Sequence, residues 1–255
     1  MCRILCVNRA TARRRKRPDK DEALRKRMRE LAEERKRFGA PRLHVLLKQE
    51  GLVVNHKRTE RIYREERLSL RRGKKKQRTT EPRKPEEAVS GPNECLAMDF
   101  VHDSLADGRA IRIWTLIDLW DRTCPMLTVG FSQSGQGVIN VLNRLSEQGR
   151  LPRALRADNG PEFTCKGLQT WARERGITIE HTRPGKPTDN GHIESFNGRL
   201  REECLNQHIF TSLSEAQEKI EAWRQDYNHV RPHGSLGWLT PAAYRENYTN
   251  QKPRC

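Results

Sequence analysis

Apolar residues in the first third of the chain recur at the spacing of amphipathic helices. Between residues 19 and 38 they fall three to four positions apart on one helical face, and charged residues fill the other faces. A second short helix is predicted for residues 41–50, and Gly51 follows it as glycine often follows a helix C-terminus. The pattern therefore predicts two packed helices whose inward side consists of Leu24, Met28, Leu31, Phe38, Leu43, Leu46 and Leu47.

A third helix, predicted for residues 55–68, differs from the first two in its charge. Asn55 is a suitable N-cap, and Ile62 and Tyr63 are predicted to face inward. A helix, a short turn and a basic helix make up the helix-turn-helix plan, in which the second helix contacts DNA. The alternative is a solvated helical hairpin without a partner. The DNA-binding interpretation assigns the outward side of this helix to DNA contacts, namely Lys57, Arg58, Arg61 and Arg64.

From residue 95 onward the pattern changes to strands alternating with helices. Three strands joined by short turns, one of them at Asp107–Gly108, predict an antiparallel meander over 95–104, 111–120 and 124–131. Further strands are predicted at 153–158 and 177–182, with helices at 134–148, 161–176, about 192–204 and 212–228. This order predicts an α/β fold with a five-stranded mixed sheet and helices on both faces, as in ribonuclease H. The order of strands within the sheet rests on that analogy.

Charge separates the two regions. The net charge of the 255-residue chain is +17, and residues 1–78 hold 28 Lys and Arg against 10 Asp and Glu. The remainder holds 22 against 23. A positive charge confined to one segment points to a polyanion-binding module, and the basic run at 71–78 adds to it. We expect a basic helical domain at 1–78, a proline-containing linker at 79–93 and a catalytic core with a helical tail at 94–255.

The cysteines and the hydropathy limit the class of protein. Seven cysteines are spread widely and include no CxxC pair, so a structural zinc site is not expected. Scattered single cysteines suit a reducing compartment. No run approaches the roughly 18 apolar residues of a membrane span. The sequence therefore predicts a cytoplasmic protein without a membrane partner.

Three acidic residues stand where strands and helices begin or end. Asp99 lies in the middle of the first predicted strand, Asp158 ends the fourth, and Glu194 follows the Gly/Pro-rich loop 185–191 in the first turn of a helix. Such positions can converge at one edge of a mixed sheet. Three carboxylates suit Mg²⁺ or Mn²⁺, and two such ions roughly 3.5–4 Å apart would hold both reacting oxygens of a phosphodiester displacement.

Each of these acids also has an ordinary structural explanation. The first could face solvent, the second could shape a turn, and the third could complement the helix dipole. Other acids compete with them for the catalytic role. Asp118 competes most strongly because it ends the second predicted strand near Asp99, whereas Asp121 is expected to form a surface pair with Arg122.

Three segments of the chain together resemble the DDE catalytic motif of retroviral-integrase-like transposases: AMDFVHD (97–103), RADNGPEF (156–163) and GKPTDNGHIESFNGRLREECLN (185–206). The resemblance is closest to the second-reading-frame protein (OrfB) of the IS-three family of bacterial insertion sequences, which has 35 residues between the last two acids. Residues 37–68 also resemble that family's helix-turn-helix, and YNHVRPHGSLGWLTPAAY (227–244) resembles its C-terminal signature. The similarity covers roughly residues 20–245.

The resemblance implies roles for particular residues. Asp99, Asp158 and Glu194 would bind the catalytic Mg²⁺ or Mn²⁺ ions, two in number. Arg201, seven positions after Glu194, would hold a DNA phosphate. Further DNA contacts are expected from Asn159, Lys186 and Asn197. Trp120 departs from the family pattern because it is bulkier than expected at the end of the second strand.

The resemblance also implies an activity and partners. The expected reaction is cleavage and transfer of DNA strands by a multimer on double-stranded element ends and target DNA, at the bacterial nucleoid. A fusion with an upstream-frame protein is expected in this family, and the start of the chain resembles the interior of the family's N-terminal region. Two alternatives remain: a ribonuclease-H-like nuclease without strand transfer, and a catalytically inactive DNA-binding repressor.

Overall fold

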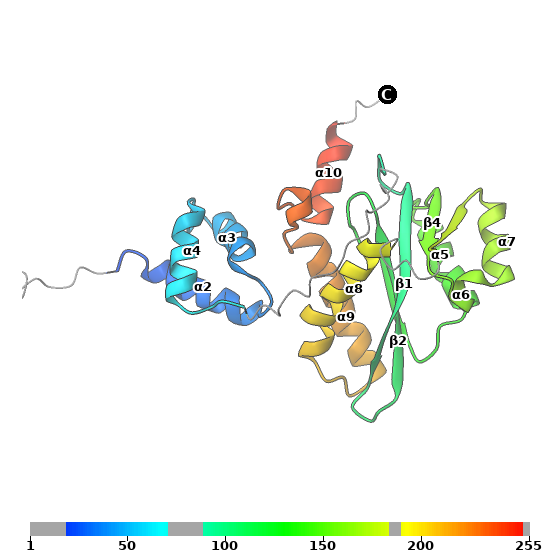
Figure 1. Ribbon diagram of the computed structural model, residues 1–255, viewed down its shortest axis with the longest axis horizontal. Coiled ribbons are helices and arrows are strands. Elements are labelled where there is room, and N and C mark those ends of the chain that lie inside the picture. The colour runs from blue at the N-terminus through cyan, green and yellow to red at the C-terminus, as the bar shows by residue number, and fades with distance from the viewer. Residues whose placement is uncertain (1–18, 71–88, 184–189, 252–255) are drawn as a thin grey trace, which may run out of the picture. The chain divides into compact units, whose positions relative to one another are not determined.

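The computed structural model describes residues 19–70, 89–183 and 190–251, shown in colour in Figure 1. These residues form two compact units, a helical one and a sheet-containing one. The basic run at 71–78, most of the predicted linker and Lys186 lie outside the described residues.

The helical unit consists of α2 (Glu22–Glu34), α3 (Ala40–Gln49) and α4 (His56–Glu65). All seven residues predicted to face inward from the first two helices are buried, as are Ile62 and Tyr63 of α4. Asn55 caps α4, because its side chain accepts a hydrogen bond from the Lys57 N–H at 3.0 Å. Gly51 has φ +73°, the left-handed conformation that lets the chain turn after α3. The prediction for this unit is confirmed, although α2 ends at Glu34 rather than at residue 38.

The second unit is built on five strands in the order β3-β2-β1-β4-β5. β1 (Cys95–Ser104), β2 (Ala110–Asp118) and β3 (Met126–Gly130) pair antiparallel, whereas β4 (Ala154–Ala157) and β5 (Thr178–His181) add to the sheet in parallel. The turn at Asp107–Gly108 joins β1 to β2, and Gly108 has φ +84°. The predicted five-stranded mixed sheet is confirmed.

Helices cover both faces of the sheet (Figure 1). α8 (Gly191–Glu203) and α9 (Leu213–His229) pack on one face, and α5 (Gly135–Glu147), α6 (Pro161–Thr164) and α7 (Lys166–Glu174) pack on the other. Side chains of β1 alternate between the two cores: Ala97 and Val101 lie on the α8 side, and Leu96 and Met98 lie on the α5 side. The alternation therefore places Asp99 on the face that α8 covers.

The single helix predicted for 161–176 is wrong, because the chain breaks it into α6 and α7. Cys165 between them adopts an extended backbone, with φ −64° and ψ 143°. Its side chain lies against Gly135 at the start of α5, where an added Cβ would approach the Cys165 sulfur to 2.4 Å. The break therefore lets the turn after β4 and the α7 helix pack separately on the same face.

The C-terminal part of this unit contains η2 (Leu205–Gln207), η3 (Gly234–Leu236) and α10 (Pro241–Gln251). α10 explains the bulky Trp120, whose ring centroid lies 5.0 Å from that of Tyr244 and 4.5 Å from that of Tyr248. Trp120 thus provides an aromatic contact for the last helix at the end of β2.

The described residues contain four cysteines, all with free thiols: Cys95, Cys124, Cys165 and Cys204. Burial raises the pKa of the Cys124 thiol to about 12, which is the behaviour of an inert core cysteine. None of the helices within the described ranges is long and apolar enough to cross a membrane.

Candidate active site

Asp99 lies in the middle of β1 and is half-buried. Its Oδ1 accepts a hydrogen bond from the Phe100 N–H at 2.7 Å, and its Oδ2 accepts one from Asn197 Nδ2 at 2.8 Å. Burial, and after it the negative charges of Asp158 and Glu194, raise the pKa of Asp99 to about 6 against the lowering effect of these two hydrogen bonds. The charges of all three predicted carboxylates therefore act on one region of the molecule.

Asp158 owes its place to the pairing of two parallel strands. Ala97 of β1 pairs with Arg156 of β4, and the same offset, continued by two residues, brings Asp158 level with Asp99. Asp158 is exposed, and its Oδ1 accepts a hydrogen bond from the Gly160 N–H at 2.9 Å. The turn after β4 thus holds this carboxylate at the C-terminal end of the strand.

Glu194 belongs to the first turn of α8, where its side chain is exposed. Apolar residues of the same helix, Ile193 and Phe196, are buried against the sheet. One turn after Glu194, the Asn197 amide reaches Asp99 directly. Packing of α8 on β1 and β2 therefore brings the third carboxylate toward the first.

The three acids lie in one region of the molecule but do not form a finished metal site. Within the described ranges, no three His, Cys, Asp or Glu side chains form a ready-made metal-binding cluster. The donor set itself is suitable for a hard divalent cation, because it consists of carboxylate oxygens. Burial first, and then repulsion from Asp158 and Glu194, raise the pKa of Asp99, and a bound cation would relieve that repulsion.

The other predicted residues near this site have defined contacts. Arg201, two turns after Glu194 on α8, is exposed and donates from Nη2 to the His102 carbonyl oxygen at 2.9 Å. Asn159 is exposed and donates from Nδ2 to the Thr182 carbonyl at 2.8 Å. Asn197 is half-buried, and its amide contacts Asp99 and the Thr115 hydroxyl. Asn197 was predicted as a DNA contact, but its side chain is engaged inside the protein.

The structure gives Asp118, the strongest competitor for the catalytic role, a structural partner. Asp118 lies at the far end of β2, opposite Leu96, and is fully buried. Its carboxylate accepts a hydrogen bond from Arg245 at 2.6 Å. Asp121, expected to be a surface residue, is also fully buried and pairs with the same arginine, so that expectation is wrong. Both acids serve to attach α10 to the end of the sheet.

One contact near Asp158 was missed in the sequence. Arg112 on β2 lies over the Phe100 ring at 4.2 Å and donates to Glu162 Oε1 at 2.5 Å. Burial alone would raise the pKa of Glu162, but the hydrogen bond from Arg112 lowers it below its ordinary value. Glu162 belongs to α6, so this ion pair ties the turn that carries Asp158 to the sheet. The one available signal was an arginine inside an otherwise buried strand.

The predicted DNA-contacting residues of α4 fall into two groups. Lys57 and Arg64 are exposed, whereas Arg58 and Arg61 both bind the carboxylate of Asp21 at the start of α2. These two hydrogen bonds, that from Arg61 first, lower the pKa of Asp21.

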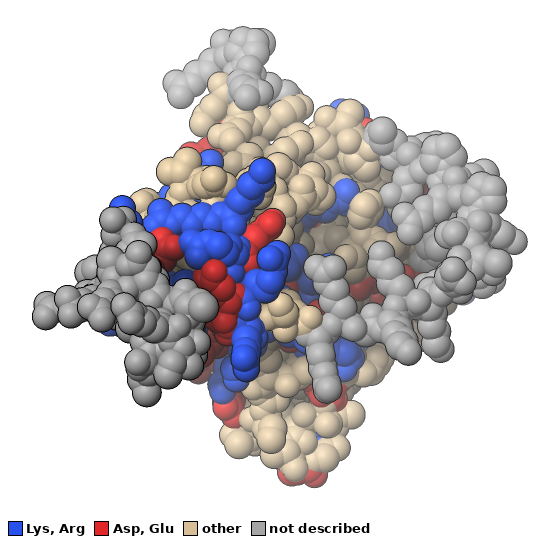
Figure 2. Space-filling model, turned by 60° about the vertical axis from the view of Figure 1, so that its left-hand side comes forward, with Lys and Arg blue, Asp and Glu red and all other residues tan. Residues whose placement is uncertain are grey.

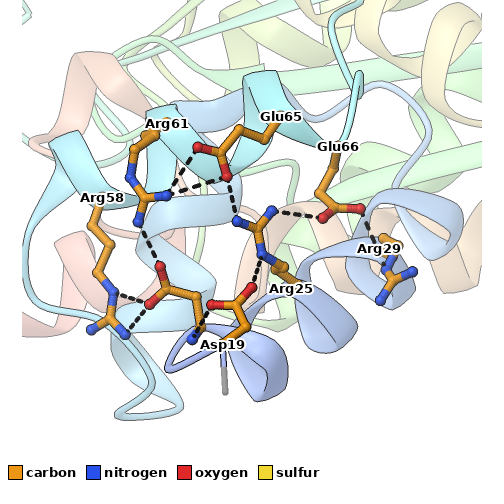
Figure 3. Close-up of polar contacts among 8 residues, drawn as sticks. Asp19, Arg25, Arg29, Arg58, Arg61, Glu65 and Glu66 are labelled. Atoms are coloured by element: carbon orange, nitrogen blue, oxygen red, sulfur yellow. Dashed lines mark hydrogen bonds and ion pairs between the residues drawn. The ribbon is translucent and has the colours of Figure 1, made fainter. Parts of the chain in front are cut away.

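A network of charged residues extends from this contact (Figure 3). Arg61 also binds Glu65 at 3.0 Å, and Arg25 of α2 binds Asp19, Glu65 and Glu66. Basic and acidic side chains are interleaved on the face seen in Figure 2. The network, which we call the α2–α4 ion-pair network, consists of Asp19, Asp21, Arg25, Arg29, Arg58, Arg61, Glu65 and Glu66.

Comparison with protein families divides the chain in the same way. Residues 19–76 match a family described as an HTH-like domain. Residues 89–187 and 175–241 match two families that are both described as an integrase core domain. The carboxylate region lies within the integrase-core matches, and the α2–α4 ion-pair network lies within the HTH-like match.

Comparison with individual proteins points to mobile elements. The chain is 42% identical to an insertion element IS407 protein of Burkholderia multivorans, over 95% of this chain and 88% of the relative. It is 27% identical to the putative transposase InsK of insertion sequence IS150 from Escherichia coli, over 89% of this chain and 84% of the relative.

Solved structures share the fold. A simian T-cell lymphotropic virus intasome structure matches with a TM-score of 0.57 at 17% identity, covering 89% of this chain and 75% of that chain. The HTLV-2 integrase catalytic core in complex with magnesium matches with a TM-score of 0.50 at 16% identity, covering 61% of this chain and 97% of that chain. At these identities the comparison establishes the architecture alone.

Proposed function

Because this chain belongs to the IS-three family of bacterial insertion-sequence transposases, we propose that it cleaves and joins DNA strands with Asp99, Asp158 and Glu194. The observation that supports the site is the pairing of β1 with β4, whose register, continued by two residues, sets Asp158 level with Asp99 at the end of β4. The contact of Asn197 with Asp99 supports the placement of Glu194, on the same helix, near these two acids.

In the proposed complex, these three carboxylates would hold two Mg²⁺ or Mn²⁺ ions. The ions would supply positive charge that offsets the negative charge of the phosphodiester. The protein itself holds the carboxylates in place. Asp99 is fixed by two hydrogen bonds, Asp158 by the turn after β4, and Glu194 by the packing of α8. Arg201, exposed on the same helix, would bind a DNA phosphate beside them.

The reaction consists of two displacements at phosphorus. In the first, a water oxygen bonds to phosphorus as the bond to the 3′ oxygen breaks, which leaves a free 3′-hydroxyl. In the second, this hydroxyl attacks another phosphodiester and releases a second 3′ oxygen. Neither step requires a covalent enzyme intermediate.

The proposal assigns DNA binding to both units. Residues 1–78 would bind element-end DNA through Lys57 and Arg64 and the basic run at 71–78, with Arg58 and Arg61 available once they leave Asp21. Residues 94–255 would hold the reacting strands, with Asn159 and Lys186 as further DNA contacts. Joining two ends calls for a multimer on DNA, alone or with an upstream-frame protein.

The test is a joining assay with DNA that carries the element's terminal repeat and a pre-cut 3′-hydroxyl end. The wild-type chain is expected to join this end to target DNA when Mg²⁺ or Mn²⁺ is present, and Asp158→Asn and Glu194→Gln are expected to abolish joining. Glu218→Gln is the matched control, because Glu218 is also an exposed helical acid, on α9. With uncut DNA as a second substrate, cleavage without joining of the pre-cut end would favour the nuclease, and DNA binding without either reaction would favour the repressor.

A further inference from the structure

Thr115 is a fully buried polar residue on the sheet face that α8 and α9 cover. Its neighbours on the same face of β2, Ile113 and Ile117, belong to the core under α8 and α9. A buried hydroxyl without a hydrogen bond would be costly. The Thr115 oxygen lies 2.9 Å from Asn197 Oδ1 and 3.1 Å from the Asp99 carbonyl oxygen, so its hydrogen has two acceptors.

The Asn197 amide has its orientation fixed by both of its neighbours. Its Oδ1 accepts from the Thr115 hydroxyl, and its Nδ2 donates to Asp99 Oδ2 at 2.8 Å. The reversed amide would place its oxygen against the Asp99 carboxylate, where two acceptors would repel each other. Thr115 and Asp99 therefore select the same orientation of Asn197.

This arrangement connects three elements at one point. Thr115 pairs directly with Asp99 across β1 and β2, and Asn197 reaches both residues from α8. Glu194 precedes Asn197 by one helical turn and lies on the same side of α8. A contact that holds Asn197 on the sheet therefore also determines how closely Glu194 approaches Asp99.

We propose that Thr115 and Asn197 are positioning residues, which fix the Asp99 carboxylate and set its separation from Glu194. The proposal rests on the function proposed above. Each Asp99 oxygen then has one fixed donor, Phe100 N–H for Oδ1 and Asn197 for Oδ2, and keeps lone pairs for a cation. Residues that orient a ligand in this way typically change metal affinity or activity about 10- to 100-fold when they are replaced.

The decisive variant is Thr115→Val, which replaces the hydroxyl with a methyl group of similar size. The joining rate constant at saturating DNA is expected to fall about 10-fold or more, while the KM for DNA changes by less than about twofold. Mn²⁺ affinity of the DNA-free protein, measured from the electron paramagnetic resonance of the free ion, is expected to weaken by a similar factor. Thr115→Ser keeps the hydroxyl and is expected to restore both values.

Asn197 gives a second test that does not depend on the sheet interior. Asn197→Ala removes the bridge at a half-buried helix position, and Asn197→Asp places a second carboxylate against Asp99. We expect the aspartate variant to lose more activity than the alanine variant. Gln217→Ala is the matched control, because the Gln217 amide also joins a helix on this face to a strand, donating to the Val129 carbonyl at 2.9 Å.

The outcomes separate the two proposals. If Thr115→Val and Asn197→Ala join DNA and bind Mn²⁺ like the wild type, or if Thr115→Ser is as impaired as Thr115→Val, the positioning roles are wrong. If Thr115→Val does not fold, Asn197→Ala alone decides in the same way. If the wild type does not join DNA at all, the proposed function is wrong, and the Mn²⁺ titration still tests whether Thr115 and Asn197 orient Asp99.

Discussion

Two groups of acidic side chains, one in each unit of this protein, have opposite kinds of partner. In the helical unit, Asp21 and Glu65 each bind two arginines in the α2–α4 ion-pair network (Figure 3). In the sheet unit, the hydrogen bonds that reach the carboxylates of Asp99 and Asp158 from the described residues come from uncharged groups, a backbone N–H in each case and the Asn197 amide. An arginine neutralises the charge of a carboxylate, whereas uncharged donors leave that negative charge available to attract a cation. The contrast separates acids that join helices from acids that can bind a cation.

A second contrast lies within the sheet unit itself. Asp118 and Asp99 belong to neighbouring strands, yet Asp118 is fully buried beside Arg245 and Asp99 is half-buried beside an amide. The neighbours of an acid, rather than its place at a strand end, therefore distinguish a structural acid from a candidate catalytic acid.

Removing the charge of the candidate catalytic acids should produce the largest effect. We expect Asp158→Asn and Glu194→Gln each to reduce the joining rate at least about 1000-fold, or about 4 kcal/mol of activation free energy. DNA affinity should stay equal or rise, because each change removes a negative charge near a polyanion. Joining assays and DNA-binding titrations measure the two effects separately. A parallel loss of DNA binding would show that these acids are structural.

Arg245→Met should cause the largest loss of stability. The change leaves the fully buried Asp118 and Asp121 without their arginine, and an uncompensated buried charge costs about 3–5 kcal/mol. Urea denaturation measures the free energy of unfolding. Arg109→Met is the matched control, because the Arg109–Asp107 pair is exposed and should contribute little. Equal effects of the two changes would contradict the distinction between buried and exposed pairs.

Acid should stabilise the metal-free protein through Asp99. Its pKa is raised from 3.8 to about 6 on folding, so the folded state binds more protons between these pH values and stability falls as the pH rises through them. The cost at neutral pH is up to about 3 kcal/mol. Asp99→Asn should therefore raise the melting temperature at pH 7.5 and reduce its change between pH 4 and 6. If the pH profiles of the two proteins are parallel, the pKa of Asp99 is not raised.

Much of this architecture could be predicted because its signals are local. The helical spacing identified the inward residues of α2 and α3, and the Asp107–Gly108 turn set the pairing of β1 with β2. Ser104 at the end of β1 pairs with Ala110 at the start of β2. Counting five residues back from Ser104 and five forward from Ala110 pairs Asp99 with Thr115, so the position of the turn also determines that pair. The break at Cys165 was not predicted, because it depends on Gly135, which is distant in the sequence.

The candidate site was only partly predictable for the same reason. The three acids and their contexts could be recognised as motifs. The partners of individual charges could not, because they come from elements far away in the chain: Arg245 binds Asp121 across 124 positions, and Asn197 binds Asp99 across 98. Basic residues assigned to DNA binding, such as Arg58 and Arg61, were predicted from their charge and their outward position on the helix, and neither feature reveals an acid on a neighbouring helix.

The smallest effect concerns the α2–α4 ion-pair network and its relation to DNA. In Asp21→Asn, Arg58 and Arg61 lose a shared carboxylate, while asparagine remains a good residue for the helix start. DNA affinity should rise a few-fold at low salt, and the dependence of log affinity on log salt should steepen by about one for each arginine that reaches a phosphate. Titrations of labelled DNA at several salt concentrations measure both quantities.

Glu50→Gln separates release of these arginines from the change in net charge. It removes the same unit of negative charge from the helical unit, but its partner Arg27 keeps contacts with Glu30 and Glu34. Its salt dependence should therefore match the wild type. If Asp21→Asn instead lowers affinity, Asp21 orients the two guanidinium groups toward DNA. The acids of the helical unit would then support DNA binding by positioning arginines. The two units would then differ only in what their acids hold, which is arginine in the helical unit and a cation in the sheet unit.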